Sequence, residues 1–250
     1  MKNLKIKVSL STNVLSETTK EEMWEVYRQY YHYSKAYFME RIHRNNFFSI
    51  YRYQGQIVGF TGLRIKRTKV NKKSCVLIYF GQTVIDSRFR GQGLIPRTAI
   101  LLGKKYWKDF LLARVYVWAD ALTYKAYLVF AKNLEEYYPS YKGQTPPKFQ
   151  QLIDLVGTTY YGENYQTQTG TVHKDTVFVN DHSTIIQTRY ERDLDVLFYA
   201  ALNPNYINGH GLITMAQLHS NNCIRILARH LKKVVLKKIT ARKQVRPRFA

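Results

Sequence analysis

The chain has 250 residues, a length that favours one domain with additions, and its 45% hydrophobic and 14% aromatic residues exclude a disordered protein. Only two cysteines are present, Cys75 and Cys223, which excludes a disulfide framework and a structural zinc site built from paired cysteines. The formal net charge of +22 favours anionic partners. It does not distinguish phosphate-bearing molecules, acidic proteins, anionic lipid and nucleic acid from one another.

The N-terminal residues do not have the pattern of a signal peptide. Residues 2–8 alternate charged and apolar side chains like a half-buried strand, whereas a signal peptide has a continuous apolar run. No stretch of the chain approaches the roughly 20 apolar residues that span a bilayer, so no transmembrane segment is expected. Together with the low cysteine count, this predicts a soluble protein in a reducing, cytoplasmic compartment.

The spacing of apolar and aromatic residues predicts alternating strands and helices over the first half of the chain. Thr18 or Thr19 is the expected cap of the first helix, and Gly55 is the expected turn of a hairpin. Residues 73–86 are apolar on both faces, as in a central strand covered on both sides. The predicted elements are a strand over 2–8, helices over 21–31 and 35–43, strands over 47–53, 57–67 and 73–86, a helix over 95–110, a strand over 115–120 and a helix over 123–138.

After residue 138 the pattern becomes weaker, and we expect an elaboration of the first domain. A capped helix is predicted from about Thr145 to Val156. Short β-prone pieces follow, of which residues 176–179 are an example. A further helix is predicted over 191–202 and a late strand over 211–216.

The most specific feature is a glycine loop that joins the central strand to the next helix. It runs from Ile85 to Leu94 with the sequence IDSRFRGQGL. Gly91 and Gly93 allow the backbone to turn with its N–H groups pointing inward, and the following helix N-terminus adds partial positive charge. Arg90 can add a charge-assisted contact. The loop therefore predicts an anion site suited to a diphosphate.

In this context the loop resembles motif A of the GNAT superfamily of N-acyltransferases, in which a strand ends in a pattern like V-x-P-x-x-R-G-x-G. Ile85 stands at the valine, and residues 90–93 stand at the pyrophosphate loop. Ser87 replaces the common proline, and Ile95 replaces the small residue that usually closes the motif. The resemblance extends to the order of elements from about residue 4 to residue 138. It implies an α/β fold with a mixed, mostly antiparallel central sheet flanked by helices, followed by a C-terminal elaboration.

The resemblance also implies where acyl-CoA would bind. In the family a bulge splays the core strand from the next one, so that backbone amides can hold the pantetheine arm and the carbonyl. Thr123 and Phe130 stand where the family has an Asn that contacts pantetheine and a Tyr that often protonates the leaving thiolate. The residues expected at the acyl-CoA site are Thr83, Val84, Ile85, Arg90, Gly91, Gln92, Gly93, Leu94, Ile95, Thr123 and Phe130.

Two side chains are candidates for the chemistry. Attack of an amine on a thioester requires a neutral amine, a stabilised oxyanion and a proton for the departing thiolate. Tyr127 lies one turn before Phe130 and is a candidate acid, with a packed tyrosine as the alternative. Asp120 is a candidate acceptor of the amine's proton, with a cap of the next helix as the alternative. No histidine pair has metal-ligand spacing, and no metal is expected.

The sequence thus predicts an N-acyltransferase that moves an acyl group from a coenzyme A-type thioester to an amine by direct attack in a ternary complex. The acceptor would be a metabolite, a peptide or a protein lysine. Two alternatives stay open: transfer from an acyl carrier protein, and a catalytically idle GNAT-like module that binds nucleic acid or an anionic membrane. The expected division is an acyl-CoA-binding core over 1–140, an elaboration over 141–220 that completes the fold and shapes the acceptor or acyl site, and a basic amphipathic helix or tail over 221–250.

The last part of the chain is strongly basic. Between Arg225 and Arg248 there are ten Lys or Arg residues and no acid, with apolar residues on one helical face. We expect this segment to recruit an acidic macromolecular partner, with a solvated face as the alternative.

Overall fold

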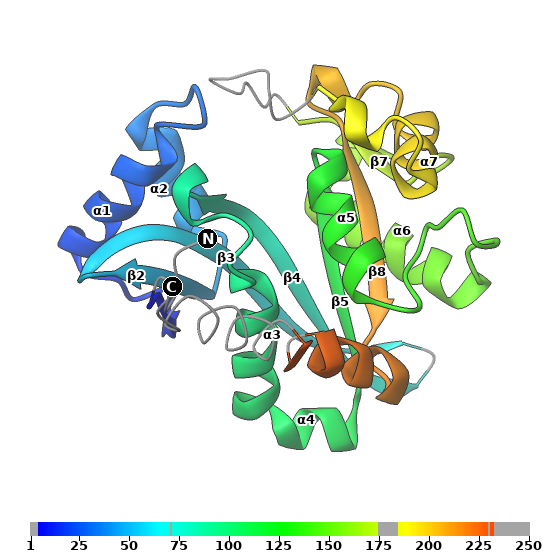
Figure 1. Cartoon of the computed structure of the whole chain (residues 1–250). Coiled ribbons are helices and arrows are strands. Elements are labelled where there is room, and N and C mark those ends of the chain that lie inside the picture. Colours follow the sequence, from blue (N-terminus) through cyan, green and yellow to red (C-terminus); the bar gives the residue numbers. More distant parts are fainter. Residues whose placement is uncertain (1–4, 71, 175–184, 230, 233–250) are drawn as a thin grey trace, which may run out of the picture.

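The computed structural model describes residues 5–70, 72–174, 185–229 and 231–232, and Figure 1 shows its helices around one central sheet. The chain begins with β1 (Lys7–Thr12), α1 (Glu17–Tyr27) and α2 (Lys35–His43). The range predicted for α2 is confirmed. The strand predicted over 2–8 lies instead at β1, and residues 1–4 are outside the described part.

The range predicted for the first helix was wrong by four residues at each end. The helix α1 starts at Glu17 because Ser16 is its cap, with the Ser16 hydroxyl accepting a hydrogen bond from the amide of Thr19 at 3.2 Å. It ends at Tyr27, so Tyr31 lies beyond the helix.

Three long antiparallel strands follow: β2 (Phe47–Tyr53), β3 (Gln56–Val70) and β4 (Lys73–Ile85). The turn between β2 and β3 contains Gly55 with a φ of 88°, as the hairpin prediction required, and Gln54, which also has a positive φ of 49°. The central strand β4 is buried along most of its length.

The helix predicted over 95–110 is two helices, α3 (Leu94–Lys105) and α4 (Trp107–Leu112). The backbone leaves helical geometry at Tyr106, where φ is −111° and ψ is 27°. The strand β5 (Arg114–Ala121) leads into α5 (Tyr124–Asn133), which ends five residues before the predicted end. Leu134, the residue that ends α5, has an extended backbone.

The second half of the chain supplies α6 (Pro147–Tyr161), β6 (Tyr165–Gln166), β7 (Thr171–Val172), α7 (Leu194–Leu202) and β8 (Gly211–Gln217). The helix predicted from residue 191 starts at Leu194, because Asp193 caps it. The β-prone piece at 176–179 lies outside the described residues. Residues 220–229 are helical, and the remainder of the basic segment after residue 232 is outside the described part.

The eight strands form one sheet in the order β1-β2-β3-β4-β5-β8-β7-β6. Every pair of neighbours is antiparallel except β4 and β5, which are parallel. The helices α5 and α7 pack on one face of the sheet, and α6 packs on the other through Phe149 and Ile153. The predicted fold class, a mixed and mostly antiparallel sheet flanked by helices, is therefore confirmed. The domain boundaries at 140 and 220 stay a prediction, although β8 from the second half is paired directly with β5.

The two parallel strands separate halfway along their length, as Figure 1 shows. Their pairing begins at Cys75–Arg114 and ends at Tyr79–Trp118, whereas β5 continues along β8 as far as Ala121. Beyond Tyr79 the strand β4 contains an irregularity in its register with β3, and Gln82 has a φ of 45°. This bulge and splay, together with the order of elements, confirm the resemblance to the GNAT fold.

Candidate functional site

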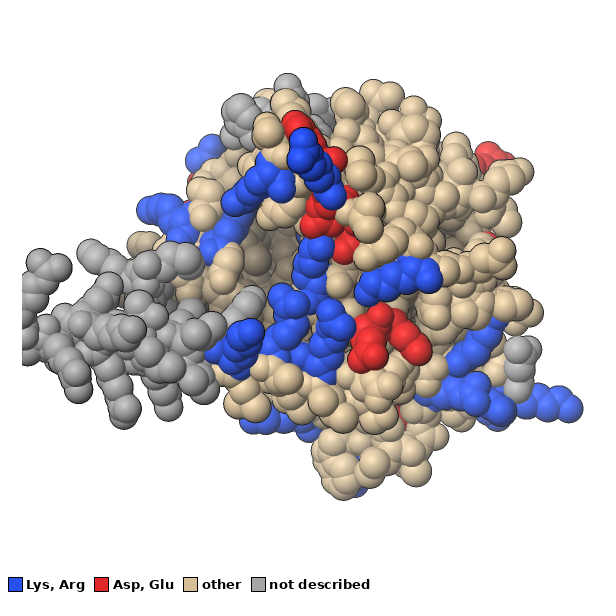
Figure 2. Space-filling model, turned by 45° about the vertical axis from the view of Figure 1, so that its right-hand side comes forward, with Lys and Arg blue, Asp and Glu red and all other residues tan. Residues whose placement is uncertain are grey.

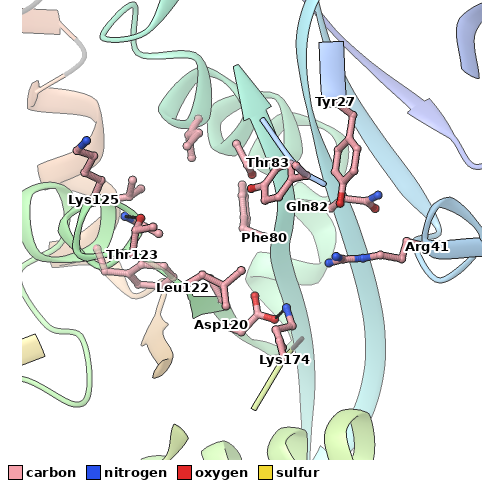
Figure 3. Close-up of a pocket in the computed structure, with 17 residues that line it drawn as sticks. Tyr27, Arg41, Phe80, Gln82, Thr83, Asp120, Leu122, Thr123, Lys125 and Lys174 are labelled. Carbon is pink, nitrogen blue, oxygen red and sulfur yellow. Dashed lines mark hydrogen bonds and ion pairs between the residues drawn. The ribbon is translucent and has the colours of Figure 1, made fainter. Parts of the chain in front are cut away.

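A cavity of about 260 Å³ lies where β4 and β5 separate, and we call it the central cavity (Figure 3). The bulge of β4 supplies one wall and the start of α5 supplies another. Ten of the seventeen lining residues are apolar or aromatic and seven are polar or charged, so the cavity offers both kinds of contact. Its lining residues are Tyr27, Tyr31, Arg41, Phe80, Gly81, Gln82, Thr83, Ile95, Ala119, Asp120, Leu122, Thr123, Lys125, Ala126, Val129, Phe130 and Lys174.

At one end of the central cavity a buried carboxylate is surrounded by donors. Asp120 forms an ion pair with Lys174 and accepts hydrogen bonds from the hydroxyls of Tyr79 (2.8 Å) and Tyr161 (2.5 Å). Burial alone would raise the pKa of Asp120, but Lys174 and the two hydroxyls outweigh it, so the pKa is lowered. Burial lowers the pKa of the Lys174 ammonium, although Asp120 opposes that shift. The sequence-based alternative, Asp120 as a helix cap, is wrong, because Thr123 caps α5 itself.

Two buried polar atoms in the wall have no hydrogen-bond partner among the described residues. They are the hydroxyl of Tyr27, whose side chain is 1% exposed, and the amide nitrogen Nε2 of Gln82. The side-chain oxygen Oε1 of Gln82 accepts a hydrogen bond from Nδ2 of Asn45 at 2.7 Å, which fixes the orientation of the Gln82 side-chain amide. Burial raises the pKa of Tyr27 above the ordinary value of a tyrosine, so its hydroxyl stays protonated at neutral pH. Because leaving a buried donor unpaired costs free energy, both groups fit a ligand with an acceptor in the cavity.

The glycine loop lies next to the other end of the central cavity. Gly91 and Gly93 have φ angles of 75° and 70°, so both glycines use the backbone freedom that the sequence predicted. Gly93 is the residue before α3, and the first amides of that helix have no partner within it. Lys125 lines the cavity on this side, and its pKa is lowered by burial and by the positive charges of Arg90 and Arg189. Positive charge therefore gathers on this side of the cavity, where it would attract an anionic ligand.

A second, larger cavity of about 510 Å³ adjoins the first, and we call it the basic cavity. The two cavities share the lining residues Arg41, Gln82 and Lys174, so they lie on either side of the same side chains. The helix α2 and the C-terminal end of α6 form its sides. Its remaining lining residues are Tyr37, Arg44, Arg64, Thr159, Tyr160, Tyr161, Asn164 and His173.

The structure brings together five of the predicted site residues in the lining of the central cavity: Thr83, Ile95, Asp120, Thr123 and Phe130. Seven others lie in the glycine loop or at the end of β4 before it, and they do not line this cavity. Two of them, Leu94 and Val84, have side chains in the core, with 2% and 3% exposure. Arg90 is exposed, and its Nε donates to the carbonyl of Ile85 at 2.9 Å. These seven residues are Val84, Ile85, Arg90, Gly91, Gln92, Gly93 and Leu94.

Tyr127, the predicted acid, does not reach the central cavity. Its side chain is fully buried, and its hydroxyl donates to the carbonyl of Pro139 at 3.1 Å. Its ring packs against Tyr137 and Tyr199, with centroids 5.7 and 5.5 Å apart. The packed-tyrosine alternative therefore describes its surroundings: Tyr127 and Phe130 belong to the same core cluster, but only Phe130 also lines the central cavity.

Replacing Tyr127 by phenylalanine should leave turnover within threefold of the wild type and lower the free energy of unfolding by about 1 kcal/mol, the contribution of one hydrogen bond. Steady-state rates and urea unfolding would check both values. A loss of turnover of roughly 10² or more with an unchanged donor affinity would return Tyr127 to the role of general acid.

Several residues of the two cavities were missed by the sequence analysis. Tyr27 and Arg41 lie on helices whose spacing indicated only ordinary packing, and Lys174 follows a stretch with little periodicity. The pairing of Lys174 with Asp120 spans 54 positions in sequence, so no local pattern could have shown it. One signal was available: Gly81 and Gln82 interrupt the apolar run of the core strand at the position of the bulge.

The described residues contain neither a cluster of metal-binding side chains nor a membrane-spanning helix. No group of three or more His, Cys, Asp or Glu side chains in this part of the chain could hold a metal ion. No helix among these residues is long and apolar enough to cross a membrane.

Comparisons with known proteins find similarity in structure alone. No protein-family model matches the chain, and no curated protein matches it. A solved aminoglycoside acetyltransferase from an uncultured soil metagenomic sample, in complex with sisomicin, has 13% sequence identity over 56% of this chain and 91% of its own, with a TM-score of 0.38. Glucosamine-6-phosphate N-acetyltransferase from Arabidopsis thaliana has 16% identity over 50% and 89%, with a TM-score of 0.36. A protein from Pyrococcus horikoshii has 16% identity over 56% and 93%, with a TM-score of 0.39.

Proposed function

We propose that this chain is an N-acyltransferase that uses a coenzyme A-type thioester and an amine acceptor. The observation that carries the proposal is the central cavity itself, which opens between two diverging parallel strands and begins beside a glycine loop at a helix N-terminus. The loop and Lys125 offer an anion site at one end, and the buried Asp120–Lys174 pair lies at the other (Figure 3). Such a cavity suits an extended ligand with a phosphate-bearing end.

The donor would lie along the cavity with its diphosphate at the start of α3. Lys125 and the neighbouring Arg90 would neutralise the phosphates, and the apolar side chains of Phe80 and Phe130 would contact the pantetheine arm. The unpaired donors on Tyr27 and Gln82 suit an acceptor such as the thioester carbonyl, whose oxygen becomes more negative during attack.

The acceptor amine would approach the thioester from the basic cavity. Its nitrogen attacks the carbonyl carbon, the carbon–sulfur bond breaks, and the thiolate leaves with the electron pair. The proton of the amine has to be removed, and Lys174 lies at the junction of the two cavities with a pKa that burial lowers. We assign to this pair a proton relay, in which the Lys174 ammonium passes its proton to the Asp120 carboxylate as it takes the proton of the amine.

The test of the proposal is acyl transfer by the whole chain, followed as thiol release from acetyl-CoA with a panel of amines, beside calorimetric binding of CoA. Thiol release that depends on the amine supports the proposal. Absence of CoA binding contradicts it, unless acyl carrier protein serves as the donor in the same assay. Binding of CoA without transfer to any amine favours the idle module.

Replacing Lys125 by glutamine should weaken CoA binding about tenfold, because one charge-assisted contact to a phosphate is lost. Lys104→Gln is the matched control, since Lys104 is exposed at the far end of α3 and lines neither cavity. Calorimetry on both variants measures the effect. Equal affinities for the two variants would place the phosphates elsewhere.

A further inference from the structure

The basic cavity is lined by cations and by no carboxylate. Its positively charged side chains are Arg41, Arg44, Arg64 and Lys174, and none of its lining residues is Asp or Glu. Figure 2 shows several Lys and Arg side chains, with some Asp and Glu side chains beside them, around a hollow on one face of the molecule. The charged groups that line the cavity are therefore all positive, which favours an anionic ligand over a cationic one.

The charges in this cavity differ in how far they are already neutralised. Arg44 forms an exposed ion pair with Glu40, and Lys174 is paired with Asp120. No carboxylate of the described residues lies within ion-pair distance of Arg41 or Arg64. Two guanidinium groups thus keep their full charge available for a ligand.

The two arginines are also held in place. The guanidinium of Arg64 lies over the rings of Tyr79 and Tyr160, at 4.3 and 5.0 Å from their centroids, and its Nε contacts Asn45 at 3.4 Å. The guanidinium of Arg41 lies 5.7 Å from the ring centroid of Tyr37. A planar donor group that is fixed by its neighbours binds a phosphate or carboxylate with little further loss of side-chain entropy.

The position of Arg41 connects this charge to the chemistry. Arg41 and Lys174 line both cavities, so a ligand bound by Arg41 in the basic cavity has its other end close to the Asp120–Lys174 pair (Figure 3). A nearby positive charge also disfavours the protonated form of an amine, so the acceptor would be neutral at a lower pH than in water. Both effects help attack on the thioester.

We propose that the acceptor is a small amine that carries a phosphate or carboxylate, and that Arg41 and Arg64 bind this anionic group in the basic cavity. This inference rests on the proposed acyl transfer, because it concerns the second substrate of the same site. It predicts selectivity against polycationic amines, since every charged group in the lining of the basic cavity is positive.

The experiment compares amines that differ only in the anion. Glucosamine with glucosamine 6-phosphate tests a phosphate, and tyramine with tyrosine tests a carboxylate. Binding of each to the full chain in the presence of CoA is measured by calorimetry, so the readout does not depend on turnover. We expect the anionic member to bind at least tenfold more tightly in one pair or both, and the pair that responds identifies the anion.

The variants separate a charge effect from a general loss of structure. Arg41→Gln should weaken binding of the preferred anionic amine roughly 10- to 100-fold, as expected for the loss of a charge-assisted hydrogen bond, and should change binding of its neutral partner less than threefold. Arg64→Gln should act in the same direction. Lys104→Gln, which removes a charge outside both cavities, should change neither.

Equal affinity for the two members of both pairs, or binding of none of them, would overturn the inference. A fall in CoA affinity in Arg41→Gln would also overturn it, because the basic cavity would then belong to the donor. If the wild-type chain does not bind CoA at all, the proposed acyl transfer itself is contradicted. Failure of the acceptor inference can therefore be distinguished from failure of the proposed function.

Discussion

Replacing Gly91 by aspartate is expected to reduce acyl-CoA affinity by a factor of 100 or more. Gly91 has a φ of 75°, so any side chain there strains the loop, and a carboxylate adds a negative charge beside the proposed diphosphate. At close range in a partly desolvated site, repulsion between like charges is worth several kcal/mol, which exceeds the roughly 1 kcal/mol of backbone strain. Calorimetric titration with CoA measures the change.

Gly103→Asp provides the matched control for that experiment. Gly103 lies near the C-terminal end of α3 and has no positive φ. Apart from its chain neighbours and the backbone of its own helix, no atom lies within 4 Å of the place where a Cβ would be added. The same substitution there should leave CoA affinity within threefold. If Gly91→Asp is folded by circular dichroism and still binds CoA like the control, the loop is an ordinary glycine turn.

Replacing Asp120 by alanine should produce the largest change in stability. The carboxylate is buried and satisfies Lys174 and two tyrosine hydroxyls at once, so its removal leaves an ammonium and two donors without their partner. Removing one partner of a buried ion pair typically lowers the free energy of unfolding by about 3–5 kcal/mol. Urea unfolding measures this value, and Lys174→Met in the same chain should recover part of the loss by removing the unpaired charge.

Asp109→Ala is the control for Asp120→Ala. Asp109 also forms an ion pair, with Arg67, but the Arg67 side chain is 62% exposed and the pair lies on the surface. Water screens such a pair, so its loss should cost less than about 1 kcal/mol. Similar losses in the two alanine variants would mean that the buried network around Asp120 contributes little to stability.

The stabilisation by Asp120 should depend on pH in a defined direction. The pKa of Asp120 is lower in the folded protein than the value of about 3.9 expected for an unfolded chain. Its contribution is therefore present above that unfolded value and is lost as the pH falls through the folded pKa. In Asp120→Ala the loss of stability with falling pH should be smaller over this range.

Local patterns in the sequence predict the elements of this protein better than its site. The helix Lys35–His43 and the strand Phe47–Tyr53 match their predicted bounds, because caps, periodicity and turn residues lie within a few positions of each other. The glycine loop could be recognised for the same reason. Ends of helices were missed where one residue decided them, as at Ser16 and Tyr106.

The site could be predicted only where it depends on adjacent residues. The loop after β4 and the start of α5 were found, but the groups around Asp120 come from β4, α6 and the segment after β7, so their meeting depends on the whole fold. Tyr127 and Phe130 show the limit on a single helix. Both belong to the same core cluster, but an offset of about 60° around the helix axis is enough that Phe130 lines the cavity and Tyr127 does not.

The pairing of β8 with β5 has a consequence for how the chain folds. The two strands are joined through about 90 residues of intervening chain, from Ala121 to Gly211, so this pairing has a high contact order. During synthesis, β5 can pair with β4 while its other edge has no neighbour until residues 211–217 have left the ribosome. An unpaired edge of a buried strand is a site for pairing with other chains. The part of the chain between β5 and β8 therefore sets how long the nascent protein is exposed to aggregation.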